Sequence, residues 1–161
     1  MTDAPLHDPA ALTRHIETRY HARHRELLPA LAAMAARVED VHFGDEDVPE
    51  GLSTLLQQMG AEMEAHVEKE TAVVFRAIRA GGMPGIDQLI SVMRAEHAGR
   101  ARDVAQIRQL TGDLTLPAGA CGTWTRLYAG LTEFVADLTE CIRLEDEVLF
   151  PQFEPAGHAV A

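Results

Sequence analysis

The chain has 161 residues, with 25 acidic and 14 basic side chains and a formal net charge of −11. This length suits one domain with a sizeable core. No Lys- or Arg-rich block offsets the negative charge, so we expect no nucleic acid and no membrane partner. No apolar run approaches the roughly 20 residues that span a bilayer. The first residues show no signal-peptide pattern, and we therefore expect a cytoplasmic protein.

The spacing of apolar residues predicts four long helices separated by turn signals. Asp8 can cap the first helix, and Pro9 suits its first position. The predicted helices cover about residues 9–41, 48–79 and 86–110, and a last stretch that starts between 118 and 123 and ends near 150. Such lengths and short connections favour an all-α, up-down-up-down antiparallel four-helix bundle over residues 9–153. Residues 1–8 and 154–161 are predicted to be tails.

The second and fourth helices share a weak internal repeat. The ten-residue segments that begin at His66 and Cys141, aligned without gaps, share Glu at the fifth position, Val at the eighth and Phe at the tenth. Both His and Cys are residue types that bind metals. Because residues four apart lie on one face of a helix, each donor can point to the same spot as its carboxylate, Glu70 or Glu145.

The turn positions place candidate ligands from all four helices at one height. In an antiparallel hairpin, the residue that lies level with a given residue is fixed by the centre of the turn. The first turn pairs His21 with His66 or Glu70, and the second turn pairs His66 with His97. The third turn pairs His97 with Cys141. Each helix is therefore predicted to present a donor to one zone inside the bundle.

The direction in which these residues face supports a metal site. Most of the candidates lie within the apolar arcs of their helices, and Cys141 lies slightly to one side. Two inward carboxylates without an Arg at their level would repel and desolvate each other, and bound metal removes that cost. Carboxylates from two helices bridge two ions in di-iron bundles. The candidates inside the arcs are His66, Glu70, His97 and Glu145.

The residues also bear on which histidine of the first helix is a ligand and on which metal is bound. The apolar face of the first helix lies closer to His24 than to His21, so periodicity alone favours His24. Carboxylate and imidazole donors suit iron or manganese better than structural zinc, which prefers a closed tetrahedron. Iron is the first choice, and manganese is the less favoured one.

At these residues the chain resembles the hemerythrin-like (HHE) family, and more narrowly the di-iron proteins called repair of iron centres. The resemblance covers about residues 11–153. It is carried by several stretches that are specific only in combination. They are RYHARHRELLP at 19–29, VEDVH at 38–42, HVEKE at 66–70, ISVMRAEH at 90–97, ACGTW at 120–124, LE at 144–145 and VLFP at 148–151.

This resemblance implies a set of metal ligands. It favours His21 over His24 in the first helix, and it implies that Glu96 lines the approach to the metals. The implied set contains the histidine ligands His21, His66 and His97 and the bridging carboxylates Glu70 and Glu145.

The chain departs from its relatives in two ways. Relatives place His where this chain has Cys141. A thiolate ligand would lower the iron potential and add a sulfur-to-iron charge-transfer band, whereas a neutral thiol would leave one ion with fewer ligands; both alternatives stay open. Many relatives also carry an N-terminal domain with adjacent cysteines. This sequence begins at the bundle, so we expect steps that need those cysteines to use a partner or to be absent.

The resemblance implies a non-haem di-iron protein that supports iron–sulfur cluster repair under nitrosative or oxidative stress. It would act through binding or release of iron, NO or O2, with iron–sulfur proteins as its targets. The alternative is a hemerythrin-like O2 or NO carrier or sensor without turnover. Hemerythrins proper use five histidines, whereas this chain offers three. The sequence leaves open whether the activity is catalytic.

Overall fold

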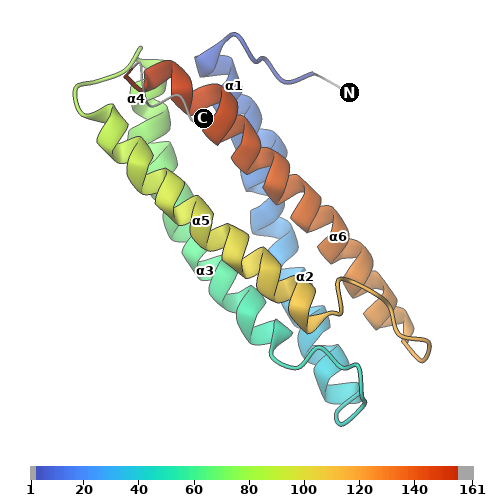
Figure 1. The fold of residues 1–161 in the computed structure, drawn as a ribbon. Helices are drawn as coiled ribbons and strands as arrows, with labels where there is room; N and C mark the ends of the chain where they lie inside the picture. The colour runs from blue at the N-terminus through green and yellow to red at the C-terminus, as the bar shows by residue number, and fades with distance from the viewer. Residues whose placement is uncertain (1–2, 156–161) are drawn as a thin grey trace.

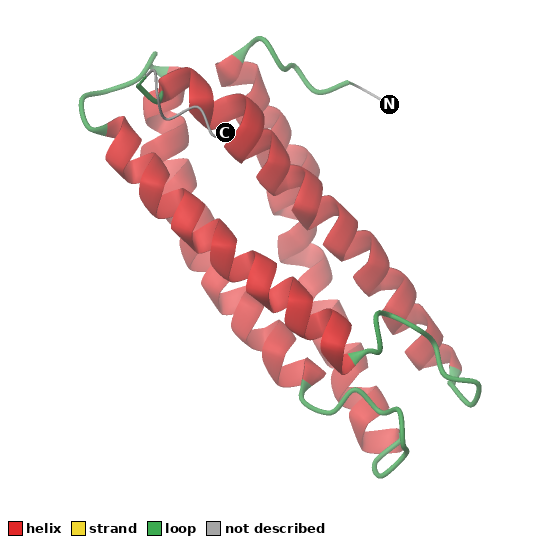
Figure 2. Cartoon of the chain, in the orientation of Figure 1, coloured by secondary structure: helices red, strands yellow, loops and turns green. Residues whose placement is uncertain are grey.

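The computed structural model describes residues 3–155 as four long helical rods (Figures 1 and 2). The described residues contain no β-strand, which confirms the all-α prediction. The helices are α1 (Pro9–Ile16), α2 (Ala22–Val41), α3 (Leu52–Lys69), α4 (Arg76–Arg79), α5 (Ile86–Leu110) and α6 (Gly122–Arg143). α1 and α2 form the first rod, and α3 and α4 form the second. α5 is the third rod, and α6 begins the fourth. A short 3-10 helix, Phe150–Phe153, ends the fourth rod.

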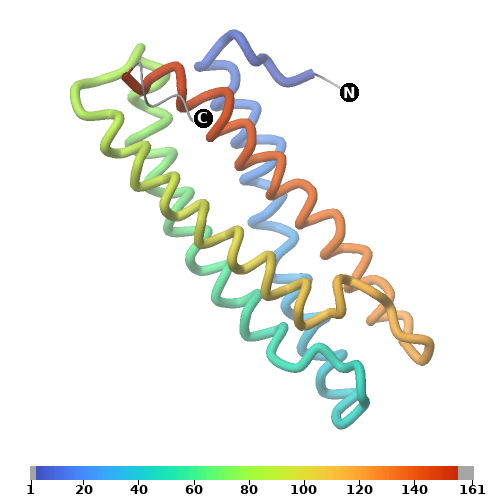
Figure 3. The backbone as a smooth tube through the Cα atoms, in the orientation of Figure 1, coloured from blue at the N-terminus to red at the C-terminus, as the bar shows by residue number. Residues whose placement is uncertain are grey.

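The rods run alternately up and down, as the backbone trace shows (Figure 3). The connections after α2 and after α5 lie at one end of the bundle, and the connection after α4 lies at the other end, near the start of α1. This arrangement confirms the antiparallel four-helix bundle. Met1, Thr2 and residues 156–161 lie outside the described residues, so the predicted tails are only partly visible. Glu154, which the sequence assigns to the tail, accepts a hydrogen bond from Arg94 at 3.1 Å.

The starts of α1 and α3 are capped in different ways, one by a neighbouring residue and the other by a residue of another helix. Asp8 caps α1 by accepting a hydrogen bond from the amide of Ala11 at 3.1 Å, as predicted. The predicted start of the second helix near residue 48 is wrong, because α3 begins at Leu52 after Gly51 in the left-handed region, with a φ of 92°. Glu39 of α2 supplies the missing cap, since its carboxylate accepts a hydrogen bond from the amide of Gly51 at 2.6 Å.

Three of the rods contain a π-helical turn, in which a backbone N–H reaches one residue further back than in an α-helix. The three turns are Glu17–His21, Glu70–Phe75 and Leu144–Leu149. In the first, the Ala22 amide donates to the Glu17 carbonyl. Such turns inside α-helices often mark functional positions. Each of these turns contains one of the predicted ligands.

The apolar core is split into two clusters along the bundle axis. One cluster fills the space between α2, α3 and α6 and extends as far as Met63 and Leu138. The other fills the end near α1 and α4 and begins at Val74 and Cys141. The buried histidines and glutamates lie in the zone between the two clusters. α2 and α6 approach closely in the first cluster, where an added Cβ at Gly130 would lie 2.7 Å from Leu31.

Candidate metal centre

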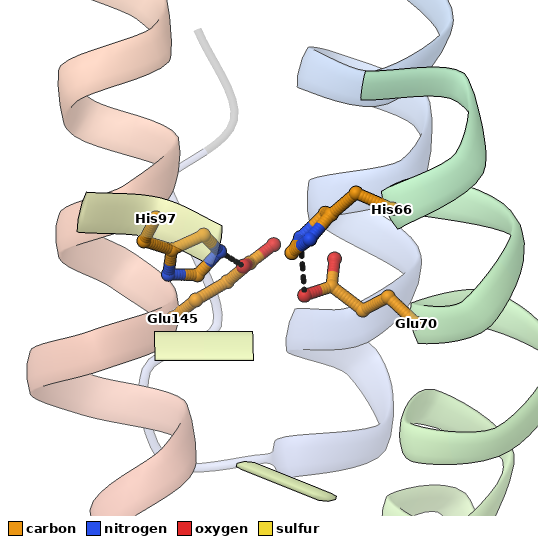
Figure 4. A group of neighbouring side chains, drawn as sticks. All are labelled: His66, Glu70, His97 and Glu145. Atoms are coloured by element: carbon orange, nitrogen blue, oxygen red, sulfur yellow. Dashed lines mark ion pairs between the residues drawn. The ribbon is translucent and has the colours of Figure 1, made fainter. Parts of the chain in front are cut away.

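The predicted ligands form two groups that share one carboxylate, and Figure 4 shows the first of these groups. Potential ligand atoms of His66, His97, Glu70 and Glu145 lie within 4.8 Å of one another. Those of His21, Cys141 and Glu145 also lie within 4.8 Å of one another. We refer to the first group as the His66–His97 position and to the second as the His21–Cys141 position. The structure therefore brings all six predicted site residues together.

Each of the two carboxylates faces histidines of both positions. Oε2 of Glu145 lies 2.9 Å from Nε2 of His97, and its Oε1 lies 3.4 Å from Nε2 of His21. Oε2 of Glu70 lies 3.3 Å from Nε2 of His66, and its Oε1 lies 3.2 Å from Nε2 of His21. One oxygen of each carboxylate is thus directed to each position. This is the geometry that a carboxylate bridge between two ions requires.

Both carboxylates are buried, so their negative charges are energetically unfavourable without a cation nearby. Glu70 is 0% exposed and Glu145 is 1% exposed. Within residues 3–155, neither oxygen of Glu70 has a hydrogen bond of acceptable geometry, although histidine nitrogens lie within 3.3 Å. In the described part of the chain, no Arg or Lys pairs with either carboxylate. Because an uncompensated buried charge is strongly unfavourable, the donor set fits bound metal cations.

Protons take the place of cations when no metal is bound. Burial disfavours the charged forms of His21 and His97, but the nearby carboxylates outweigh burial and raise the pKa of each to about 10. Burial also opposes ionisation of Glu145, yet the two histidines lower its pKa below the usual range. Metal binding must therefore displace protons from the imidazoles.

Cys141 lies at the edge of the site. Its Sγ is 3.8 Å from Oε1 of Glu145, and the residue is 4% exposed. Burial and the Glu145 charge raise the pKa of the thiol well above its usual value. Without metal the thiol is therefore neutral, and a thiolate at this place needs a cation beside it.

The structure gives His21 and His24 different roles, although periodicity favoured His24 as the ligand. Both are buried, but only His21 belongs to one of the two groups of potential ligands. The ring of His24 packs edge-on against Phe134, with centroids 5.3 Å apart, and its Nε2 has no hydrogen-bond partner among the described residues. Burial, followed by the charge of His21, lowers the pKa of His24 to about 4. His24 is therefore a neutral side chain next to the site.

Two further carboxylates contact the outer nitrogens of the histidines. Nδ1 of His97 lies 2.8 Å from Oδ1 of Asp146, and Nδ1 of His66 lies 3.4 Å from Oε1 of Glu96. Asp146 is not among the site residues predicted from the sequence, although its place directly after Glu145 turns it toward the neighbouring rod. Glu96, expected to line the approach, does line the cavity described below.

A cavity of about 260 Å³ adjoins the ligands. Its wall includes side chains from α2, α3, α5 and α6, among them His24, Glu96 and Arg100. A cavity of this size beside both positions has room for a small ligand.

Comparison with known proteins agrees with this geometry. Residues 12–153 match the family described as the hemerythrin HHE cation binding domain. The chain is 43% identical over 150 residues to the iron-sulfur cluster repair protein YtfE of Pectobacterium atrosepticum, covering 93% of this chain and 66% of that protein. It is 41% identical over 143 residues to a probable iron-sulfur cluster repair protein of Haemophilus influenzae, covering 89% and 64%.

A third relative is the YtfE protein of Edwardsiella ictaluri, 44% identical over 151 residues, with 92% of this chain and 66% of that protein covered. The chain thus spans about two thirds of the length of these curated relatives. Within residues 3–155, no helix combines the length and apolar character needed to cross a bilayer. The match over residues 12–153 and the identity to these relatives establish that the chain belongs to the hemerythrin HHE cation-binding family.

Proposed function

We propose that this chain is a non-haem di-iron protein that supports the repair of iron–sulfur clusters damaged by nitrosative or oxidative stress. It would act by binding or releasing iron, NO or O2 in the bundle formed by residues 9–153. The observation that carries the proposal is that Glu70 and Glu145 each direct one oxygen to each of two metal positions.

The proposed ligands divide between the two positions. His66 and His97 would hold one ion, and His21 and Cys141 would hold the other. Glu70 and Glu145 would bridge the two ions. Carboxylate and imidazole donors suit iron, and manganese is the less favoured occupant. When bound, the irons would supply redox chemistry and open positions for a small ligand. The chain itself supplies charge balance, fixed donor positions and an apolar core on either side of the site.

The target of the activity follows from the relatives. Their names describe iron–sulfur cluster repair, and we extend that role to this chain. Damaged iron–sulfur proteins would be the partners, and iron held at the site would be the cargo. A buried set of donors with protonatable histidines fits a reversible iron store, because protons can replace the ions that leave.

A second candidate is an O2 or NO carrier or sensor without turnover. The cavity of about 260 Å³ beside the site favours it, because a small ligand could reach the metals there. A stable, reversible oxygenated or nitrosylated spectrum, without any effect on damaged cluster enzymes, would support this candidate over repair.

Two measurements test the main proposal. Metal analysis after purification without chelators should give about two irons per chain, and zero iron would refute the di-iron site. Iron-loaded protein should restore activity to a cluster-containing dehydratase inactivated by NO. The same protein carrying Glu70→Gln should fail to do so. Recovery no greater than that from an equal amount of free iron would refute the repair role.

A further inference from the structure

The two metal positions differ in what supports their ligands from outside. A histidine ligand usually donates its second ring N–H to a carboxylate, a carbonyl or a water, which fixes the ring and strengthens the metal-binding nitrogen. The His66–His97 position has such a hydrogen bond on the ring of His97 and a longer carboxylate contact on the ring of His66. Oδ1 of Asp146 lies 2.8 Å from Nδ1 of His97, and Oε1 of Glu96 lies 3.4 Å from Nδ1 of His66.

These outer carboxylates are themselves held in place. Arg94 donates to the backbone carbonyl of Asp146 at 2.9 Å and lies 3.8 Å from its side-chain oxygen. Lys69 binds both oxygens of Glu96 at 2.8 and 2.9 Å. The imidazoles of this position are therefore oriented through two successive layers of contacts. Such fixed donors lose little freedom when they bind an ion.

The His21–Cys141 position has no comparable support in the described residues. Nδ1 of His21 is buried and has no hydrogen-bond partner. The ring of His21 stacks on Phe75, with centroids 5.8 Å apart and planes at 9°, and this apolar contact supplies no hydrogen bond to the ring. The other ligand of this position that does not bridge is Cys141. The polar contact of its Sγ is with Oε1 of Glu145, 3.8 Å away. This position thus offers one unsupported imidazole and one thiol.

We propose, building on the di-iron function above, that the two positions hold iron with unequal strength. The His66–His97 position keeps its ion, and the His21–Cys141 position is the one that gives up and takes up iron. Asp146 and Glu96 act as positioning residues for the retained ion. Loss of such an outer partner typically weakens metal binding by about 10–100-fold, and we expect a difference of that size between the two positions.

Chelator challenge of the iron-loaded chain tests the inference. Anaerobic Fe(II) protein is mixed with excess ferrozine, and the coloured complex is followed over time. The wild type should release its two irons in two phases of equal amplitude, with rates that differ by about tenfold or more. His21→Ala should bind a single iron that leaves in the slow phase. A remaining iron that leaves at the fast rate would overturn the assignment.

Variants of the outer carboxylate provide a sharper test. Asp146→Asn should accelerate the slow phase by about 10–100-fold and leave the fast phase unchanged, whereas Asp146→Glu should restore slow release. The matched control is Glu147→Gln, which changes the same charge on the next, exposed residue and should change neither phase. Equal melting temperatures of the metal-free variants show that folding is not the cause.

The possible outcomes separate this inference from the proposed function. Two irons released in one phase would overturn the inequality of the positions and leave the di-iron site intact. Acceleration of both phases by Asp146→Asn, or of neither, would overturn the role of Asp146. A wild-type chain that binds no iron would refute the proposed function itself.

Discussion

Replacing Glu70 by Gln tests the carboxylate that faces both metal positions. The two side chains have nearly the same shape, so the packing around this fully buried residue should survive. The variant loses the negative charge, and its amide nitrogen cannot bind a cation. The two oxygens of Glu70 lie 3.2 and 3.3 Å from histidines of different metal positions. We therefore expect Glu70→Gln to weaken the binding of both ions.

The size of the effect follows from binding linkage. At free metal a hundredfold above its Kd, one ion stabilises the folded chain by about 2.7 kcal/mol. In a domain of this size each kcal/mol moves Tm by about 2–4 °C, so each ion should raise Tm by roughly 5–10 °C. Glu70→Gln should lose most of this rise, since the missing charge leaves neither position with its full donor set.

The assay is thermal unfolding with and without Fe(II) under anaerobic conditions, together with metal analysis. Glu68→Gln is the matched control, because it removes the same charge from an exposed residue of the same rod, two positions earlier. We expect the control to keep the full rise in Tm and about two irons per chain. If Glu70→Gln keeps the wild-type stoichiometry and Tm rise, Glu70 is not a ligand and the bridging argument is wrong.

Three other predictions concern the thiol, the histidines and the packing of the helices. Cys141→His should increase the iron retained after gel filtration, because an imidazole binds metal without ionising a buried thiol; an unchanged stoichiometry and optical spectrum would mean that position 141 does not touch metal. In the metal-free chain, the pKa values of about 10 for His21 and His97 exceed the unfolded value near 6.5. Their contribution to the free energy of unfolding should therefore be complete below about pH 6.5 and be lost as the pH rises toward about 10; urea unfolding that does not change across this window would contradict it. Gly130→Ala should leave the chain less stable than Gly60→Ala by about 1–3 kcal/mol, because the new Cβ would lie 2.7 Å from Cδ2 of Leu31, a side chain that is fully buried in the core. Gly60→Ala, with open space around it, should stabilise the chain by up to about 1 kcal/mol; equal Tm changes for the two variants would refute this packing.

The sequence predicts the bundle and the height of the site because both depend on simple geometry. Turn positions fix which residues lie level in antiparallel helices, and this reasoning places His66 beside His97 and near Cys141. The structure agrees, since His66 and His97 have ring centroids 5.0 Å apart. Burial of Glu70 and Glu145 also follows from their place in the apolar arcs. These features need only the rise of a helix and its period.

The start of the second helix depends on a contact that is distant in the sequence. Val48 and Pro49 offer a local start signal, but the chain turns once more before α3 begins at Leu52. The carboxylate of Glu39, on the preceding rod, accepts hydrogen bonds from the amides of Gly51 and Ser53. A cap supplied by another helix leaves no trace in the local pattern, so this boundary could not be predicted from the sequence.

The position of His21 shows how one irregular turn decides which residues reach the metal. The buried face runs through Leu12 and Ile16 before the π-helical turn Glu17–His21, and it reaches Tyr20 inside that turn. After it, the buried residues of α2 repeat every three or four positions from His24 onward, and this series extended backward by three residues reaches His21. The extra residue in the turn shifts the inward face by one position, so Tyr20 and His21 are both buried. A regular period of 3.6 residues cannot produce this shift. Periodicity therefore favoured His24, although the folded chain directs His21 to the carboxylates.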